Sequence, residues 1–136
     1  MTLSPSDLHG AWALDEWYVE SEDGKRTAPF GRNAQGAIMY TEDGYMTAIV
    51  SAAERFLPAD RPGDAQKAEA FSTYFNYAGR WTIDGDSVTH RIEHALDPNL
   101  VGVEMTRAID HQGNRMIFTG TMSDGKTQNV IIWKRR

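Results

Sequence analysis

Two histidines, His90 and His94, lie four residues apart in the segment His-Arg-Ile-Glu-His. This spacing matches the His-x-x-Glu-His pattern of one class of zinc proteases, in which both imidazoles bind one metal ion. The pattern serves this purpose only on a helix, because residues four apart share a helical face. The chemistry open to the segment therefore depends on whether it is a helix or a strand.

The residues around these histidines follow the alternation of a β-strand. Val88, His90, Ile92 and His94 alternate with polar residues, and the turn at 84–86 precedes them. Because successive side chains leave a strand on opposite faces, both histidines are predicted to face the apolar interior. On a strand their α-carbons lie about 13 Å apart, too far for one metal ion. This interpretation rejects zinc, and we expect no metal and no cofactor.

Arg107 shares a predicted strand face with Val103, Met105 and Ile109. A guanidinium among apolar neighbours needs a carboxylate of the protein or an anionic group of a ligand, because an unpaired buried charge is strongly unfavourable. If its strand adjoins that of His90, the two suit proton transfer beside a carbonyl, with His90 as general acid or base and Arg107 stabilising the oxyanion. The alternatives are structural: a histidine hydrogen-bonded in the core, and an ion pair for Arg107.

Aromatic side chains are the candidates for the wall of a binding site. Tyr40 shares a face with Ile38, Trp81 shares one with Ile83, and Tyr77 follows the predicted helix. Most aromatic residues at such positions are core, although a tyrosine hydroxyl can also orient a ligand. The predicted ligand-binding residues are Tyr40, Tyr77, Trp81, His90, His94 and Arg107.

Eight short strands separated by glycine turns are the elements that position these residues. The first starts at Gly10 and changes phase near Asp15–Glu16, which predicts a bulge. The others are predicted at 36–41, 45–51, 78–83, 87–94, 102–110, 114–121 and 127–134. A short helical turn at Ser4–Leu8 precedes them. The sequence predicts an all-β fold, an eight-stranded antiparallel up-and-down barrel whose interior is filled or holds one small ligand.

One substantial helix is predicted between the third and fourth strands. Asp64 is its candidate cap, and apolar residues follow at spacings of three and four. A helix at this place in the chain is free to cover one mouth of the barrel. Its predicted apolar face consists of Ala65, Ala68, Phe71 and Phe75.

Composition indicates one domain over residues 1–136 and excludes several classes of protein. The net charge of −5 argues against nucleic acid as a partner. The absence of cysteine excludes disulfides and thiolate chemistry. We find no secretory signal, no apolar run long enough to cross a bilayer, and no phosphate loop or nucleophile elbow. A cytoplasmic protein without a membrane partner is expected, and a homodimer is left open.

Motifs spread over nearly the whole chain carry a resemblance to a known family. They include Gly10-Ala11-Trp12, the hairpin Tyr40-Thr41-Glu42-Asp43-Gly44, the segment Tyr77-Ala78-Gly79-Arg80-Trp81 and the final Trp133-Lys134-Arg135. Together they resemble the bacterial lipocalin-like domain proteins, which are calycin-type barrels. The resemblance implies an eight-stranded barrel with an interior cavity. Independently of it, Trp12 is expected to meet the last strand, with Lys134 or Arg135 over its exposed ring.

The resemblance does not imply a single activity, because calycins mostly bind small apolar molecules and a minority catalyse isomerisation, cyclisation or lyase reactions. We therefore expect a barrel that binds a small, largely apolar organic molecule in its interior. The alternative is a cofactor-independent isomerase, cyclase or lyase that uses His90 and Arg107 in the same pocket. A structural barrel with a filled core is a third interpretation, but it leaves Arg107 and the histidines unexplained.

Overall fold

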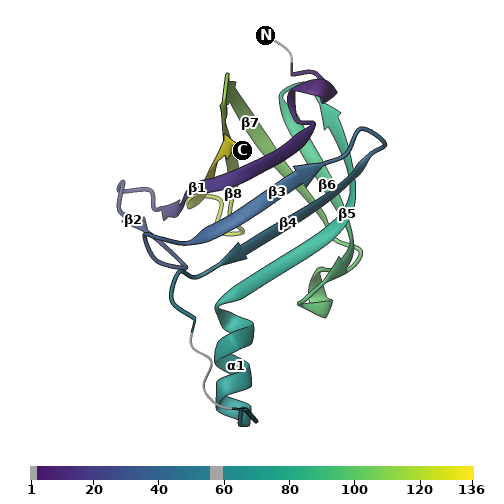
Figure 1. Ribbon diagram of the computed structural model, residues 1–136. Helices are drawn as coiled ribbons and strands as arrows, with labels where there is room; N and C mark the ends of the chain where they lie inside the picture. Colours follow the sequence, from purple (N-terminus) through teal and green to yellow (C-terminus); the bar gives the residue numbers. More distant parts are fainter. Residues whose placement is uncertain (1–2, 56–59) are drawn as a thin grey trace.

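The computed structural model describes residues 3–55 and 60–136. Within these ranges nine strands form one antiparallel sheet in the order β2-β1-β3-β4-β5-β6-β7-β8-β9, and pairing of β1 with β9 closes it. The two-residue β2 pairs antiparallel with the end of β1, and the other eight strands form the wall of a barrel (Figure 1), so the predicted fold is confirmed. The strands are β1 (Gly10–Glu20), β2 (Arg26–Thr27), β3 (Gln35–Tyr40), β4 (Tyr45–Ser51), β5 (Tyr74–Asp84), β6 (Ser87–Ala95), β7 (Glu104–Gln112), β8 (Arg115–Thr121) and β9 (Gln128–Arg135).

The bulge predicted in the first strand is confirmed. Leu14 pairs with Trp133 and Glu16 pairs with Ile132, so Asp15 is the extra residue on β1. An extra residue reverses the alternation of the strand beyond it. The inward positions of β1 therefore change from even to odd numbers, and the side chain of Trp17 lines the barrel interior.

A second bulge, which the sequence pattern did not reveal, lies on β6. Gly79 of β5 pairs with Ile92, whereas the preceding Ala78 pairs with His94, so Glu93 is the extra residue. His90 and Ile92 remain buried, at 1% exposure each, but His94 is exposed. The predicted inward orientation of His94 is therefore wrong, because the bulge reverses the alternation between Ile92 and His94.

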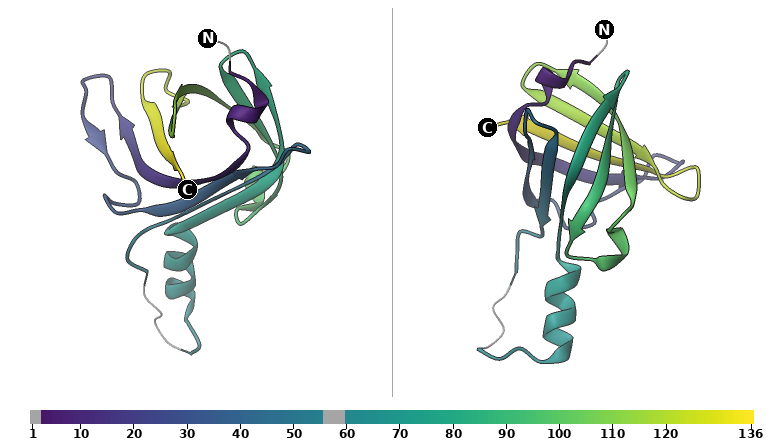
Figure 2. Two further views of the ribbon diagram at one scale, coloured as in Figure 1. Left: turned by 45° about the horizontal axis from the view of Figure 1, so that its top comes forward. Right: turned by 90° about the vertical axis from the view of Figure 1, so that its right-hand side faces the viewer.

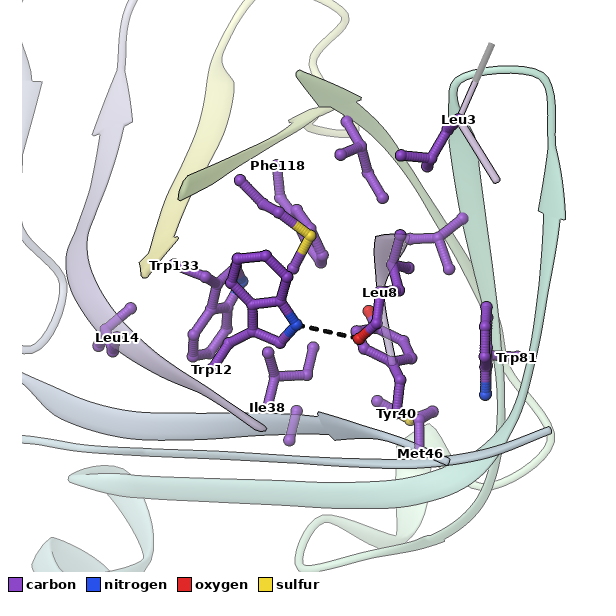
Figure 3. Close-up of a cluster of buried hydrophobic side chains, with 14 of the residues drawn as sticks. Leu3, Leu8, Trp12, Leu14, Ile38, Tyr40, Met46, Trp81, Phe118 and Trp133 are labelled. Atoms are coloured by element: carbon purple, nitrogen blue, oxygen red, sulfur yellow. Dashed lines mark hydrogen bonds between the residues drawn. The ribbon is translucent and has the colours of Figure 1, made fainter. Parts of the chain in front are cut away.

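One half of the barrel is filled by aromatic and aliphatic side chains (Figure 3). The 3₁₀-helix η1 (Pro5–Asp7) leads into Leu8, whose carbonyl accepts a hydrogen bond from Nε1 of Trp12 at 3.0 Å. The guanidinium of Arg135 lies 4.0 Å from the centre of the Trp12 ring. Of the two cations expected over this ring, Lys134 and Arg135, it is Arg135 that makes the contact. The ring is fully buried, not exposed as expected, since the N-terminal segment contributes Leu3 and Leu8 to the same cluster.

The helix α1 (Asp64–Ser72) projects from the barrel and does not cover a mouth (Figures 1 and 2). Gly63, not Asp64, is its N-cap residue. None of its side chains is buried, and Phe71 is 45% exposed. The predicted apolar face of the helix included Phe75, but β5 starts at Tyr74. Phe75 therefore belongs to a strand and faces the barrel interior, and it does not continue the helical face.

Candidate functional site

A cavity of about 220 Å³, partly open to solvent, occupies the half of the barrel that the core cluster leaves free. Every strand of the barrel wall contributes to it, together with the short helix η2 (Pro98–Leu100). Most of its lining is apolar, and no acidic side chain is part of it. The lining residues are Trp17, Ile38, Ala48, Phe75, Tyr77, His90, Leu100, Met105, Arg107, Phe118, Asn129 and Ile131.

His90 lies at the boundary between the filled half and the cavity, with a tyrosine on each ring nitrogen. The hydroxyl of Tyr40 lies 2.6 Å from Nε2, and the hydroxyl of Tyr77 lies 2.8 Å from Nδ1. Burial lowers the pKa of His90 to about 3, and the positive charge of Arg107 lowers it further in the same direction. The imidazole is therefore neutral near pH 7, and each nitrogen has a partner.

The hydrogen-bond pattern assigns the tautomer of this imidazole. Tyr40 is 2% exposed, and within the described ranges its hydroxyl has no hydrogen-bond partner other than His90. Its proton must be donated to Nε2, because a buried hydroxyl proton without an acceptor is unfavourable. The remaining proton of the neutral ring then lies on Nδ1 and is donated to Tyr77, which leaves the hydroxyl proton of Tyr77 free for another acceptor.

Both tyrosines stay protonated. Burial raises the pKa of Tyr40 well above its usual value, and burial raises the pKa of Tyr77 to about 12 against the opposing charge of Arg107. Tyr77 itself lines the cavity, whereas Tyr40 does not. The chain Tyr40–His90–Tyr77 therefore presents one hydroxyl donor at the cavity wall.

Arg107 is the one cation among the residues that line this cavity, and its side chain lies over Gly120 of β8. A β-carbon built on Gly120 would be 2.9 Å from Cδ and 3.1 Å from Nη1 of Arg107. The guanidinium donates to the carbonyl of Thr106 at 3.0 Å and contacts the sulfur of Met105 at 3.9 Å. In the part of the chain that the structure describes, no carboxylate lies within 4.0 Å of it, so the ion-pair alternative finds no partner there.

Trp17 and Asn129 add a further polar contact that sequence reasoning missed. Nε1 of Trp17 donates to Oδ1 of Asn129 at 2.6 Å, and the indole packs edge-on against Phe30 and Phe75. Two signals were present in the sequence. The predicted bulge in β1 places Trp17 inside, and Asn129 shares a strand face with the apolar Ile131.

The structure brings together three of the six predicted ligand-binding residues. Tyr77, His90 and Arg107 line the cavity, and Tyr40 reaches it only through His90. Trp81 lies in the filled half, where its Nε1 donates to the carbonyl of Thr41 at 3.1 Å.

His94 lines a different hollow on the outer side of the barrel, with Thr47, Asn76 and Leu96 among its neighbours. Its exposure and its distance from the cavity both follow from the bulge at Glu93.

Neither a metal cluster nor a membrane-spanning helix is found where the structure describes the chain. Over residues 3–55 and 60–136, no three His, Cys, Asp or Glu side chains are arranged to hold a metal ion. Over the same ranges, no helix combines the length and the apolar character that crossing a bilayer requires.

Comparison with known proteins finds one family whose sequence profile matches this chain and several solved structures that are similar to it. The lipocalin-like protein from Bacteroides uniformis ATCC 8492 is 13% identical with a TM-score of 0.53, over 96% of this chain and 99% of that one. An uncharacterized protein from Bacteroides eggerthii DSM 20697 is 12% identical with a TM-score of 0.50, over 93% and 98%. The fluorescent protein UnaG is 12% identical with a TM-score of 0.45, over 98% and 100%.

At these identities the solved structures show a shared fold. No curated protein matches the sequence. The sequence profile of the lipocalin-like domain matches residues 9–136, which is nearly the whole chain and includes every strand of the barrel wall. The chain therefore belongs to the lipocalin-like domain family.

Proposed function

We propose that the barrel binds a small, largely apolar organic molecule in its cavity. The observation that carries this proposal is the composition of the cavity wall, in which apolar side chains surround a few convergent polar groups. Pockets for small molecules have this composition, because apolar contact supplies affinity and a few polar groups fix orientation. Tyr77, Arg107 and Asn129 are the polar groups placed to orient the molecule.

Cavity size limits the ligand to a compact molecule. An apolar protein cavity of about 150 Å³ is large enough for benzene. The larger volume of about 220 Å³ leaves space for one ring and a short substituent. A single-ring compound therefore fits the pocket as it stands.

Ligand-induced thermal stabilisation tests the proposal. A molecule that binds only the native state raises the melting temperature according to its concentration relative to Kd. We expect Ala48→Leu to abolish this rise, because Ala48 lines the cavity and is 3% exposed. Ala108→Leu is the matched control, since Ala108 is exposed on β7. Native mass spectrometry of the freshly purified protein identifies any molecule that copurifies.

The outcomes of this test are distinct. A shift that Ala48→Leu removes and Ala108→Leu keeps supports binding in the cavity, provided that circular dichroism shows both variants to be folded. An equal shift in wild type and Ala48→Leu contradicts the proposal, because the molecule then binds elsewhere.

A cofactor-independent isomerase, cyclase or lyase is the second candidate function, with Arg107 as oxyanion stabiliser and His90 as general acid or base. The favouring observation is the guanidinium of Arg107, which keeps unpaired donors at the cavity. His90 is less suited to its role, because both ring nitrogens are hydrogen-bonded and burial lowers its pKa to about 3. Binding is therefore the favoured function. If His90→Ala kept full turnover of an identified substrate, the catalytic role of His90 would be wrong.

A further inference from the structure

Three polar groups at the cavity wall, those of Arg107, Tyr77 and Asn129, have hydrogen-bond donors without a partner in the described ranges. Arg107 carries five N–H groups, and its contacts with Thr106 and Met105 involve only Nη1 and Nη2, one acceptor each. No carboxylate lies within 4.0 Å of it in the described ranges, and no acidic side chain lines the cavity. A cation placed in this way attracts a negatively charged group of the ligand.

Tyr77 presents a second donor, whose direction follows from the tautomer of His90. Tyr40 donates to Nε2, so Nδ1 carries the ring proton and donates to the hydroxyl oxygen of Tyr77. The hydroxyl proton of Tyr77 is then available to a ligand, and the hydrogen bond received from His90 polarises it as a donor.

Asn129 presents a third donor. Its Oδ1 accepts from the indole N–H of Trp17 at 2.6 Å, which fixes the orientation of the amide. The NH₂ group of Asn129 therefore points away from Trp17, and it has no hydrogen-bond partner among residues 3–55 and 60–136. Asn129 pairs with Gly120, and the side chain of Arg107 lies over Gly120. These two donors are thus next to each other across β8.

We propose that the ligand is a compact ring-bearing carboxylate, whose oxygens accept hydrogen bonds from Arg107, Tyr77 and Asn129. A carboxylate offers acceptors alone, and a guanidinium binds its two oxygens side by side. The ring lies against the apolar wall that includes Phe75, Phe118 and Ile131. This inference rests on the proposed function, but it specifies the chemical class of the ligand.

Gly120 gives Arg107 the space to lie flat along the wall. A β-carbon at this position would be 2.9 Å from Cδ of Arg107, closer than packed side chains approach. Gly120 does not adopt a positive φ, which is the conformation that specifically favours glycine. The missing side chain, and not a special conformation, is therefore what the site uses.

Calorimetric titration with acids and their primary amides tests the inference. The probes are benzoate, trans-cinnamate and cyclohexanecarboxylate, each paired with the amide of the same shape. We expect at least one acid to bind about tenfold or more tightly than its amide, as hydrogen bonds to a charged group predict. In Arg107→Met the affinity for the acid falls to that for the amide, and in Tyr77→Phe it falls by a smaller factor.

The outer surface supplies a matched control. Arg80 lies 4.9 Å from the ring centre of Tyr45 and donates to its hydroxyl at 2.8 Å, and both side chains are exposed. Arg80→Met and Tyr45→Phe therefore remove the same chemical groups outside the cavity, and they should keep the preference for acids. Gly120→Ala moves the side chain of Arg107, so we expect it to reduce that preference while circular dichroism shows an intact fold.

Each outcome decides one of the two proposals. Equal binding of acid and amide overturns the carboxylate inference and leaves small-molecule binding in place. A preference for acids that survives in Arg107→Met also overturns the inference. If no acid of the panel binds at about 1 mM, which corresponds to about −4.1 kcal/mol, the carboxylate inference is overturned, and the binding proposal is decided by the thermal-shift test with Ala48→Leu.

Discussion

His90 shows how one residue can belong to the core and to a site at the same time. It is 1% exposed, and its two nitrogens are held by Tyr40 and Tyr77. The residue thereby fixes the direction of the Tyr77 hydroxyl without touching the carboxylate that we propose. In the binding function that we propose its role is positional, whereas the sequence pattern suggested a direct acid–base role.

Burial of His90 as a neutral ring makes the free energy of unfolding depend on pH. The native pKa of about 3 lies below the ordinary histidine pKa of 6.5, so between these values the unfolded chain binds a proton that the native protein does not. Stability is therefore fully present above pH 6.5 and falls as pH decreases toward 3, by about 1.4 kcal/mol per unit from this residue. Urea unfolding at pH 7.5 and 5.5 should show this slope in wild type and its loss in His90→Gln.

The exposed His94 on the same strand supplies the control for this prediction. We expect His94→Gln to retain the wild-type dependence on pH. A His90→Gln protein with an unchanged slope would mean that the pH dependence comes from other groups.

The residues of the site could be predicted only in part. The alternation around Val88 placed His90 inside, and the apolar neighbours of Arg107 placed it in the lumen, and both side chains line the cavity. The partners could not be predicted, because contacts such as Trp17 with Asn129 join residues 112 positions apart. Such contacts depend on strand pairing and barrel closure, which a single strand does not encode.

At the scale of elements, register decides which side chains face inward. Strand periodicity predicted β6 correctly up to Ile92, and the bulge at Glu93 then reversed the phase. The sequence of β6 contains no glycine or proline that would mark the bulge. The glycine that accommodates it is Gly79 on the neighbouring strand, where a β-carbon would be 1.9 Å from the carbonyl oxygen of Arg91.

Gly79→Ala should therefore destabilise the protein strongly. The clash is with backbone of β6, which cannot move as a side-chain end does, and we expect a loss of about 3 kcal/mol or more. Gly63→Ala is the control, because its nearest neighbour would be 3.9 Å away, at the end of the Gln66 side chain. Chemical unfolding compares the two. A Gly79→Ala protein as stable as wild type would show that the bulge is not needed.

The helix α1 was predicted in position but not in its relation to the barrel. A spacing of three at Ala65, Ala68 and Phe71 indicates a helix, yet no side chain of α1 is buried. Periodicity reports an apolar face and does not report what covers it. The predicted role as a cover of the barrel mouth needed a turn between α1 and β5, whereas β5 starts at Tyr74, two residues after the helix ends.

The molecule as a whole divides into a filled half and a hollow half. The filled half holds Trp12 and Trp133 together with the N-terminal segment (Figure 3), and the hollow half holds the cavity. The two ends of the chain meet at the filled half. Arg135, near the C-terminus, donates to the carbonyls of Asp7 and His9 and lies over the ring of Trp12.

Removal of this closing contact should lower stability without changing the cavity. We expect Arg135→Met to reduce the free energy of unfolding by about 2 kcal/mol, since the guanidinium lies on a buried indole and bonds to two carbonyls. Arg136→Met is the control, because Arg136 bonds to the carbonyl of Ala11 through its backbone N–H, which the substitution keeps. Equal stability of the two variants would contradict the assigned role of Arg135.

The placement of the four tryptophans makes intrinsic fluorescence a direct measure of ligand binding in the cavity. Trp12, Trp81 and Trp133 are packed in the filled half, at 7% exposure or less, and Trp17 stands at the cavity wall. Of the four tryptophans only Trp17 lines the cavity, so a molecule that enters it changes the surroundings of Trp17 alone. Intrinsic emission should therefore shift on binding in wild type and stay constant in Trp17→Phe, even where thermal stabilisation shows that the variant still binds. Screening for the natural ligand then needs no dye or label.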